Sequence, residues 1–284
     1  MADDLATVRA RIHGVQQLDT VIGAMRGIAA THAQQSRALL PGFRAYAGII
    51  AGAIAQALRL RDADRPVGPS QPAATRQGRI VICAEQGFVG SFSEQVLDAA
   101  LARPAPAELL LIGSRGIALA ETRGVAIAWR TMMATQVSGI APLCVRIADA
   151  LYELLPARHL AAVEVVLPVW APGQGLHIET RSLLPLSEAR FRALPMSVAP
   201  LTTLPPEELL DSLAAEYVYA ELCDAAMQAF VAENEARVAA MVRARNNVRD
   251  MLATLQSAER QVRQEAITAE LVELAGAIRP PAHG

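Results

Sequence analysis

Few residues in this chain stand in an arrangement that could do chemistry. The most suggestive is the loop Glu85-Gln86-Gly87-Phe88-Val89-Gly90-Ser91, which follows an apolar run at 79–84. A glycine-bearing loop between a strand and a helix is where an α/β fold holds a phosphate group. The GxxG spacing alone is a weak signal. The alternative interpretation is a tight strand-to-helix turn that packs on the long helices of the chain.

The other side chains exclude several kinds of catalysis. All 26 basic residues are arginine, which excludes a Walker A lysine, a Schiff-base lysine and a lysine general base. Glu85 could be a general base but has no visible partner, and no GxSxG, HExxH or supported Ser/His/Asp arrangement occurs. Cys83, Cys144 and Cys223 form no CxxC pair, and the five histidines lack metal-ligand spacing. We therefore predict no catalytic residue, no metal and no cofactor, and a buried thiol at Cys83.

Composition narrows the class of protein further. The net charge of −2 gives no support for a nucleic-acid partner. No window holds 18 uncharged apolar residues, as a transmembrane helix requires. The start, Met-Ala-Asp-Asp, lacks the apolar region of a signal peptide. We expect a cytosolic protein whose link to any membrane is made through a partner.

The C-terminal quarter predicts one very long helix, over 207–278. Between Pro206 and Gly276 there is no glycine or proline, and a helix of this length spans roughly 100 Å at about 1.5 Å per residue. Asn234, Arg245 and Glu259 interrupt its apolar seam, either as ordinary imperfections or because the helix meets a changing, partly polar surface. Apolar residues recur at 3,4 spacing, at Met227, Val231, Val238, Met241, Val248, Leu252, Leu255 and Val262.

The N-terminus predicts a second long helix, over 3–60. Pro41 should kink or break it before a weaker helical stretch at 43–58. Apolar residues recur at 3,4 spacing, at Leu5, Val8, Ile12, Val15, Leu18, Ile22, Met25 and either Ile28 or Ala29. Residues 1–65 carry eight arginines and five acidic residues (net +3), whereas 207–284 carry seven arginines and thirteen acidic residues (net −6). The opposite charges favour an antiparallel coiled coil of the two helices.

The middle of the chain changes periodicity. Residues 61–78 are rich in proline and polar residues and predict a linker. Residues 79–200 then alternate strand and helix patterns, with strands expected at 79–84, 108–112, 125–129, 161–169 and 176–184. The last two are expected to pair through a turn at 172–175. The fold class is therefore α/β: a mainly parallel sheet with one antiparallel hairpin, attached to the coiled coil.

At this point the chain resembles the gamma subunit of F-type ATP synthases. Residues 232–241 (AENEARVAAM) are similar to the Ser-Glu-x-x-Ala-Arg-Met-x-Ala-Met run of that family, and 263–274 (RQEAITAELVEL) to its C-terminal signature. The family's Lys-Ile-Thr-Lys is replaced by Thr20-Val21-Ile22-Gly23, and its Asp-Arg-Gly turn by Glu85-Gln86-Gly87. The chain has no inserted cysteine pair of the chloroplast kind. It looks like a divergent bacterial member.

The resemblance implies a rotor shaft. The coiled coil is expected inside the hexamer of alpha and beta subunits, with catalysis on the beta subunits. The α/β domain and the segment at 200–208 are expected at the foot, against the epsilon subunit and the membrane c-ring. Such a shaft couples ion flow through the c-ring to ATP synthesis or hydrolysis, at the cytoplasmic face of a bacterial cell membrane.

The resemblance also implies which residues contact other subunits. For Arg237, Arg245 and Arg249, which form a basic band with Arg243, the alternative is a solvated helix face. For Arg263 it is pairing with Glu259, and for Met25 it is core packing. The implied contact residues are Met25, Arg237, Arg245, Arg249, Arg263, Gln264, Thr268 and Glu270.

Two other functions stay open from the residues alone. One is an enzyme whose α/β domain binds a nucleotide while the helices serve dimerisation, which direct nucleotide binding would reveal. The other is a static coiled-coil scaffold, which rotation coupled to ATP hydrolysis would exclude.

Overall fold

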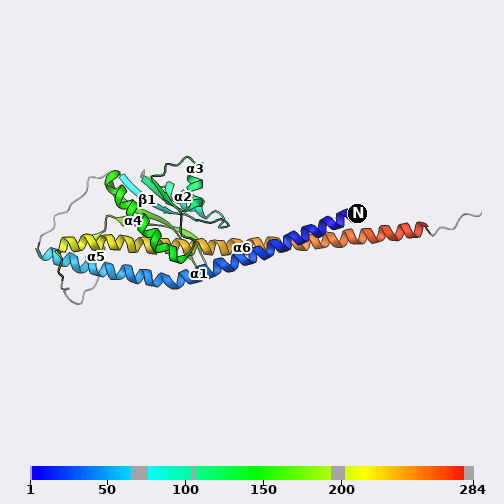
Figure 1. Ribbon diagram of the computed structural model, residues 1–284, viewed down its shortest axis with the longest axis horizontal. Coiled ribbons are helices and arrows are strands. Elements are labelled where there is room, and N and C mark those ends of the chain that lie inside the picture. The colour runs from blue at the N-terminus through cyan, green and yellow to red at the C-terminus, as the bar shows by residue number, and fades with distance from the viewer. Residues whose placement is uncertain (1, 65–75, 104–106, 193–201, 278–284) are drawn as a thin grey trace, which may run out of the picture. The chain divides into compact units, whose positions relative to one another are not determined.

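The structure is a computed structural model that describes residues 2–64, 76–103, 107–192 and 202–277. It divides into two compact units. Unit 1 comprises residues 1–28 and 238–284, and unit 2 comprises residues 29–237. Two long helices, α1 (Ala2–Asp64) and α6 (Pro206–Ala277), each contribute residues to both units (Figure 1). The long C-terminal helix predicted over 207–278 is thus confirmed as far as Ala277.

Helix α1 corrects the expectation at Pro41. The helix continues from Ala2 to Asp64 with Pro41 inside it, although an interior proline removes one backbone hydrogen bond. The neighbouring Leu40 and Phe43 pack against the main core of unit 2. This packing holds the helix together across the proline, so the stretches before and after it are one element.

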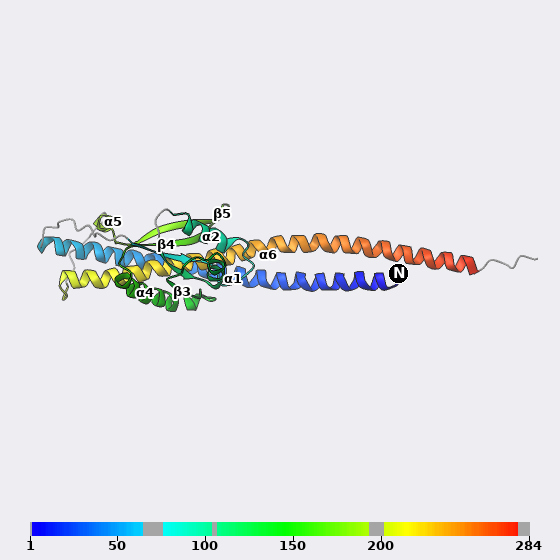
Figure 2. The ribbon, with the colours of Figure 1, turned by 90° about the horizontal axis from the view of Figure 1, so that it is seen from above.

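Unit 1 is an antiparallel helix pair, as predicted. Ion pairs join Arg9 to Glu259 at 2.9 Å and Asp19 to Arg245 at 3.1 Å, so sequence numbers rise along α1 as they fall along α6. Figure 2 shows the two helices running side by side. Seam residues of both helices form a small apolar core of Ile22, Met241 and Val248, flanked by Val15, Met25, Ala244 and Leu252.

One predicted seam residue of α1 is wrong, because Leu18 is 48% exposed. Of the two alternatives at the end of the seam, Ala29 is buried, whereas Ile28 is 60% exposed. A two-helix pair buries only a narrow stripe of each helix, so apolar residues beside that stripe stay in contact with solvent.

Unit 2 contains the predicted α/β sheet, in the order β3-β2-β1-β4-β5. Its strands are β1 (Arg76–Ile82), β2 (Ala107–Ile112), β3 (Trp129–Thr131), β4 (Leu160–Ala171) and β5 (Gly175–Leu184). β1 pairs in parallel with β2 and β4, and β2 with β3, while β4 and β5 form the expected antiparallel hairpin. The fold class is confirmed.

Several element bounds differ from the sequence prediction. β3 begins at Trp129 rather than Val125 because Val125 N–H caps the end of the helix α3 (Ser114–Thr122), donating to Ala120 O at 2.9 Å. β1 begins at Arg76, inside the expected linker, because it extends alongside β2 and β4. Residues 61–64 of that linker belong to α1, which ends at Asp64. Residues 65–75 of the linker and residues 193–200 of the expected domain lie outside the described residues.

Helices cover both faces of the sheet. α2 (Phe92–Leu101) and α3 (Ser114–Thr122) lie on one face; α4 (Ile140–Ala157) and α6 lie on the other. Along β1, Ile80 and Ile82 belong to the core with α4 and α6, whereas Val81 belongs to the core with α2 and α3. Burial on both faces explains why the predicted strands are continuous apolar runs.

A third apolar cluster joins α1 to the short helix α5 (Glu188–Arg192) and to α6. It consists of Ile54, Ala55, Leu58, Phe191 and Tyr217. One described helix, within Asp4–Arg61 of α1, is long and apolar enough to cross a membrane by length and composition alone; its most apolar window is 17% buried. The packing of Ile54 and Leu58 in this cluster shows part of that helix serving as a protein contact.

Candidate functional site

The suggestive loop after β1 is a closed turn held by a carboxylate. The backbone N–H groups of Glu85 and Gln86 donate to the two oxygens of Glu233 on α6, at 3.2 and 3.1 Å. The Glu233 side chain is only 5% exposed. In an α/β fold, amides at this edge are the groups that would hold a ligand phosphate. Here the chain's own carboxylate occupies them.

Arg237 also binds this turn. Its guanidinium donates to the Glu233 carboxylate at 2.6 Å and to the carbonyl oxygens of Gly87 and Gln86 at 3.2 and 3.4 Å. A further bond reaches the side-chain oxygen of buried Asn234 at 3.2 Å. Because Glu233 and Arg237 stand four residues apart on α6, both side chains reach the same turn.

Glu85 closes the neighbouring loops in the same way. Its carboxylate accepts hydrogen bonds from the backbone and hydroxyl of Ser114, at 3.0 and 2.6 Å, and from Met133 N–H at 2.8 Å. It therefore ties together the loops that follow β1, β2 and β3. This structural role replaces the general-base role that the sequence left open for Glu85.

Close backbone packing at this edge requires glycine. Gly113 has φ +99°, and a Cβ there would lie 2.3 Å from the Cys83 carbonyl oxygen. Phe88, in the turn, has φ +61° with its ring exposed. The Cys83 thiol is buried as predicted, and burial raises its pKa to about 12.

The predicted basic band is split between two environments. Arg237 is buried in the turn contact of unit 2, whereas Arg243 and Arg249 are exposed in unit 1. Arg245 is half-buried and bonds to Asp19 at 3.1 Å. Arg249 and Arg243 thus keep exposed guanidinium groups, while Arg237 and Arg245 have partners within the chain.

The residues predicted nearer the C-terminus lie on exposed faces of α6. Arg263 bonds to Glu259 at 3.0 Å, as its alternative interpretation expected, and Glu259 also binds Arg9. These arginines, Arg9 foremost, hold the pKa of Glu259 below its usual value. Gln264 and Thr268 line a shallow groove, and Thr268 donates to the Gln264 carbonyl at 2.8 Å. Glu270 is exposed.

Met25 is half-buried and packs against the small apolar core of unit 1. Its side chain touches the same cluster as Ile22, Met241 and Val248. The packing alternative is therefore realised, while part of the side chain stays open to a neighbouring molecule.

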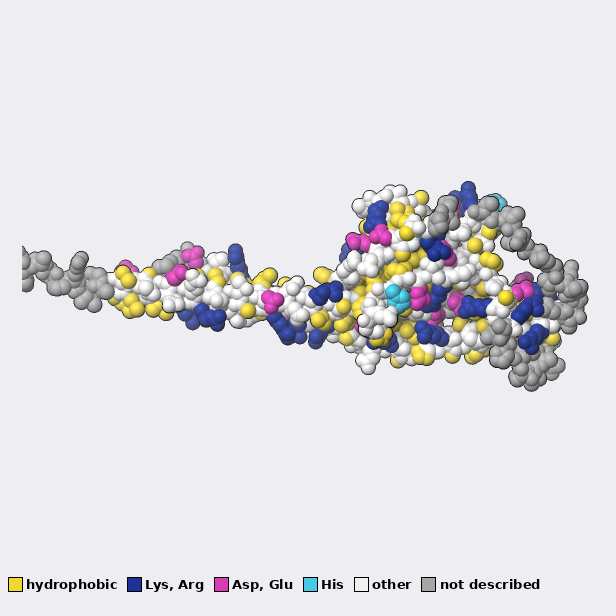
Figure 3. Space-filling model, turned by 180° about the vertical axis from the view of Figure 1, so that it is seen from behind, with side chains coloured by type: hydrophobic (Ala, Val, Ile, Leu, Met, Phe, Trp, Pro, Cys, Tyr) yellow, Lys and Arg dark blue, Asp and Glu magenta, His cyan; other side chains and the backbone are white. Residues whose placement is uncertain are grey.

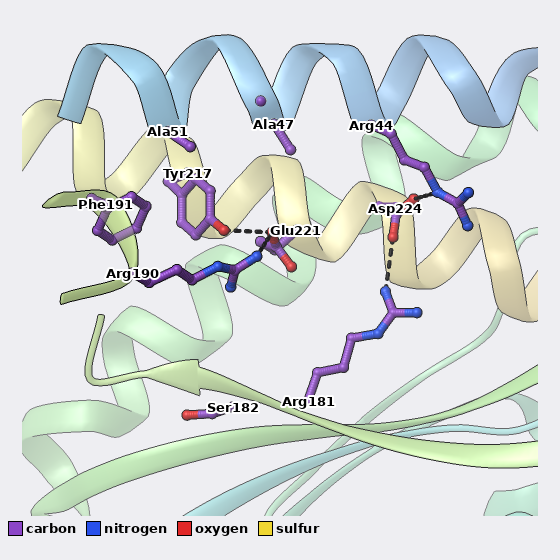
Figure 4. Close-up of a pocket in the computed structure, with 11 residues that line it drawn as sticks. Arg44, Ala47, Ala51, Arg181, Ser182, Arg190, Phe191, Tyr217, Glu221 and Asp224 are labelled. Atoms are coloured by element: carbon purple, nitrogen blue, oxygen red, sulfur yellow. Dashed lines mark hydrogen bonds and ion pairs between the residues drawn. The ribbon is translucent and has the colours of Figure 1, made fainter. Parts of the chain in front are cut away.

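A cavity in unit 2, of about 630 Å³, was not foreseen from the sequence (Figure 4). Its arginines come from distant parts of the chain, and each one binds an acidic residue of α6. Arg181 bonds to Asp224 at 2.8 Å, with Arg44 on the other oxygen at 3.5 Å, and Arg190 lies 3.6 Å from Glu221. These ion pairs fasten β5, α5 and α1 to α6. They could not be foreseen because their members are far apart in sequence.

The polar side chains described above form hydrogen bonds and ion pairs within the chain, between its own loops, strands and helices. Among the described ranges, no group of three His, Cys, Asp or Glu side chains could hold a metal ion. The polar side chains at the carboxyl edge of the sheet bind the chain's own turns. A helix pair joined to an α/β domain that is closed in this way defines a stalk-type structural subunit.

Comparison with known proteins agrees with this class of subunit. A family model described as ATP synthase matches residues 4–279. The chain belongs to this family, that of the ATP synthase gamma subunit.

The similarity to curated relatives extends over whole chains. The ATP synthase gamma chain of Frankia casuarinae is 26% identical and that of Parafrankia sp. is 28% identical, each alignment covering 100% of both chains. Among solved structures, a chain of the Euglena gracilis mitochondrial ATP synthase (OSCP/F1/c-ring) has a TM-score of 0.65 at 12% identity, covering 98% of this chain and 94% of its own. A chain of the Tetrahymena thermophila central stalk and c-ring gives 0.55 at 14% identity, covering 79% and 99%. The structural matches show a shared fold.

Proposed function

We propose that this chain is the rotating central shaft of an F-type ATP synthase, coupling ion flow through a membrane c-ring to ATP synthesis or hydrolysis. As a member of the gamma family it is a non-catalytic stalk subunit of a membrane-associated complex. In the proposal the beta subunits carry out catalysis. The complex is placed at the cytoplasmic face of a bacterial membrane.

The exposed apolar end of α6 carries the proposal. Ile267, Leu271, Val272 and Leu274 are each more than half exposed, and apolar side chains gather on this end of the helix in Figure 3. Contiguous apolar surface on a polar protein usually marks a contact with another protein. A surrounding sleeve formed by the alpha and beta subunits would bury it.

The surface of α1 in unit 2 supports a second contact, at the foot. Leu39 and Ile49 are 47% and 69% exposed, and a Cβ added at Gly48 or Gly52, near Ile49 in sequence, would have no neighbour within 4 Å. Small residues let another backbone come close. We assign this surface to the epsilon subunit and the c-ring. The assignment also accounts for the apolar character of α1 without placing it in a membrane.

The carboxylates at the sheet edge weigh against the nucleotide-binding alternative. A nucleotide phosphate would have to displace buried Glu233 from the amides of Glu85 and Gln86, next to Glu85 itself. Like charges at this distance repel strongly in a partly buried site. The proposal therefore expects no nucleotide binding by the isolated chain.

A pair of substitutions tests the two proposed contacts. Replacing Leu271 and Val272 together with Asp should abolish binding to the alpha/beta hexamer, because two charges would enter an apolar sleeve. Both side chains are exposed, so the chain itself should fold normally. Co-purification with the hexamer measures the effect.

Ile49→Asp provides the matched control. It also places a carboxylate at an exposed apolar position, but in unit 2. This variant should bind the hexamer normally and lose binding to the epsilon subunit or the c-ring. Normal hexamer binding by the double variant would contradict the proposed insertion of α6.

A further inference from the structure

We propose that Glu233 is the positioning residue that makes the α/β domain and the adjoining part of α6 turn as one body. Its carboxylate acts as a built-in anion, bound in the amide turn where other α/β folds bind a ligand. The inference rests on the proposed rotary function and names the contact inside unit 2 that bears the load.

The geometry of the contact is specific to a carboxylate. Two backbone amides, of Glu85 and Gln86, each point at a different oxygen of Glu233, at 3.2 and 3.1 Å. An acceptor with two equivalent oxygens satisfies both amides together, whereas an amide side chain offers only one oxygen. With Arg237 at 2.6 Å, the buried charge of Glu233 is fully neutralised.

Donors and acceptors alternate across the contact. Glu233 accepts from the turn, and Arg237 donates to the carbonyl oxygens of Gly87 and Gln86 in the same turn. Hydrogen bonds are directional, so four bonds in opposite senses resist sliding of the turn along or around the helix.

The apolar packing beside this contact lacks its directionality. Around the contact of Glu233 and Arg237 with the turn, here called the clamp, α6 buries small Ala229, Ala232 and Ala236 together with larger Met227 and Phe230. Hydrophobic attraction holds these surfaces together but is non-directional. The directional hydrogen bonds of the clamp therefore add angular locking that the apolar packing does not supply by itself.

The first experiment measures load in the assembled complex. ATP synthase carrying Glu233→Gln is placed in vesicles, and ATP-driven ion pumping is measured against an increasing opposing ion gradient. The variant should pump at a near-normal rate without a gradient, yet stall at a gradient at least twofold lower than wild type. A wild-type stalling gradient overturns the proposal.

Glu164→Gln is the matched control. Among the described residues, Glu164 forms ion pairs with buried Arg79, where β4 pairs with β1, and with Arg103, rather than with α6. The Glu164→Gln substitution removes a buried ion pair of the same domain. Glu164→Gln should lower stability while leaving the stalling gradient unchanged. An equal fall in both variants would show that general weakening of the domain, not the clamp, is responsible, and would overturn the proposal.

The second experiment uses the isolated 284-residue chain, so it does not depend on assembly. Glu233→Ala leaves the amides and Arg237 around an empty carboxylate site. Sodium formate should raise the melting temperature of this variant more than sodium chloride at equal concentration, with no such difference for wild type or Glu164→Gln. Equal effects of the two salts on the melting temperature of Glu233→Ala would overturn the proposal that the Glu233 carboxylate acts as a built-in anion.

The two experiments also separate this inference from the proposed function. If wild-type chain fails to join the alpha and beta subunits, the rotary function is wrong even where formate rescues Glu233→Ala. If wild type assembles and pumps but the Glu233 variants behave as wild type, only the clamp is wrong.

Discussion

At the scale of single residues, the structure separates charges that hold the chain together from charges that face outward. Arg245 bonds to Asp19 and Arg263 to Glu259, while Arg249 stays exposed. The family resemblance implied contacts with other subunits for all three, and spacing offered the Glu259 pair as the alternative for Arg263. The partner of Arg245 lies on the other helix, more than 200 residues away in sequence, so spacing along α6 could not indicate it.

A charge exchange can distinguish the two roles of Arg245. Arg245→Asp alone should destabilise the chain by up to about 1 kcal/mol, because it places two carboxylates face to face. Adding Asp19→Arg restores the ion pair with its ends reversed and should restore stability, measured by denaturant unfolding. The number of ions pumped per ATP is measured in the assembled complex as well. If this coupling recovers along with stability, Arg245 acts within the helix pair. Coupling that stays impaired assigns it to another subunit.

Met25 supports a prediction of the same kind. Met25→Lys should lower the number of ions pumped per ATP more than it lowers ATP hydrolysis. The half-buried position lets the flexible lysine stem stay in the apolar core while its charge reaches a neighbouring subunit. There a new ion pair would have to break at each rotation step.

Met25→Leu is the control, since it keeps the volume and the apolar character. It should leave both activities unchanged. A normal pumping ratio in a fully assembled Met25→Lys complex would refute the prediction.

At the scale of elements, periodicity predicted what local sequence controls. The 3,4 spacing located both long helices and the residues Val15, Ile22, Met241 and Val248 of the unit 1 core. It missed the continuity of α1 through Pro41, because that depends on tertiary packing of Leu40 and Phe43. The Glu233 clamp was missed as well. The i,i+4 spacing of Glu233 and Arg237 could have indicated an ion pair, but its target lies almost 150 residues away.

The junction of β1, β2 and α3 yields a prediction at this scale. Gly113→Ala should destabilise the chain by more than about 2 kcal/mol, because its Cβ would collide with the Cys83 carbonyl at a φ of +99°. Gly124→Ala is the comparison, since Gly124 also has positive φ (+67°) but has no neighbour within 4 Å of the added Cβ. It should cost only about 1 kcal/mol. Equal losses in urea unfolding would show that the close approach at Gly113 contributes nothing.

At the scale of the whole molecule, the chain combines long helices with an α/β domain whose loop amides are bound by carboxylates of the same chain. The family assignment, the antiparallel helix pair and the exposed apolar end of α6 all agree with a part that turns inside another assembly. A shaft acts on its partners only through differences in contact, since a partner shifts an equilibrium only by its differential affinity. The uneven distribution of Arg249, Arg243 and exposed apolar residues along α6 offers such differences.

Rotation itself is the most direct test of this account. The three native cysteines are buried, so a single Gln174→Cys in the exposed turn between β4 and β5 can carry a visible label. With the alpha/beta hexamer fixed to a surface, the label should turn in one direction while ATP is hydrolysed and stop when ATP is removed. A label that stays fixed while the same complex hydrolyses ATP would contradict the rotary function and favour a static scaffold.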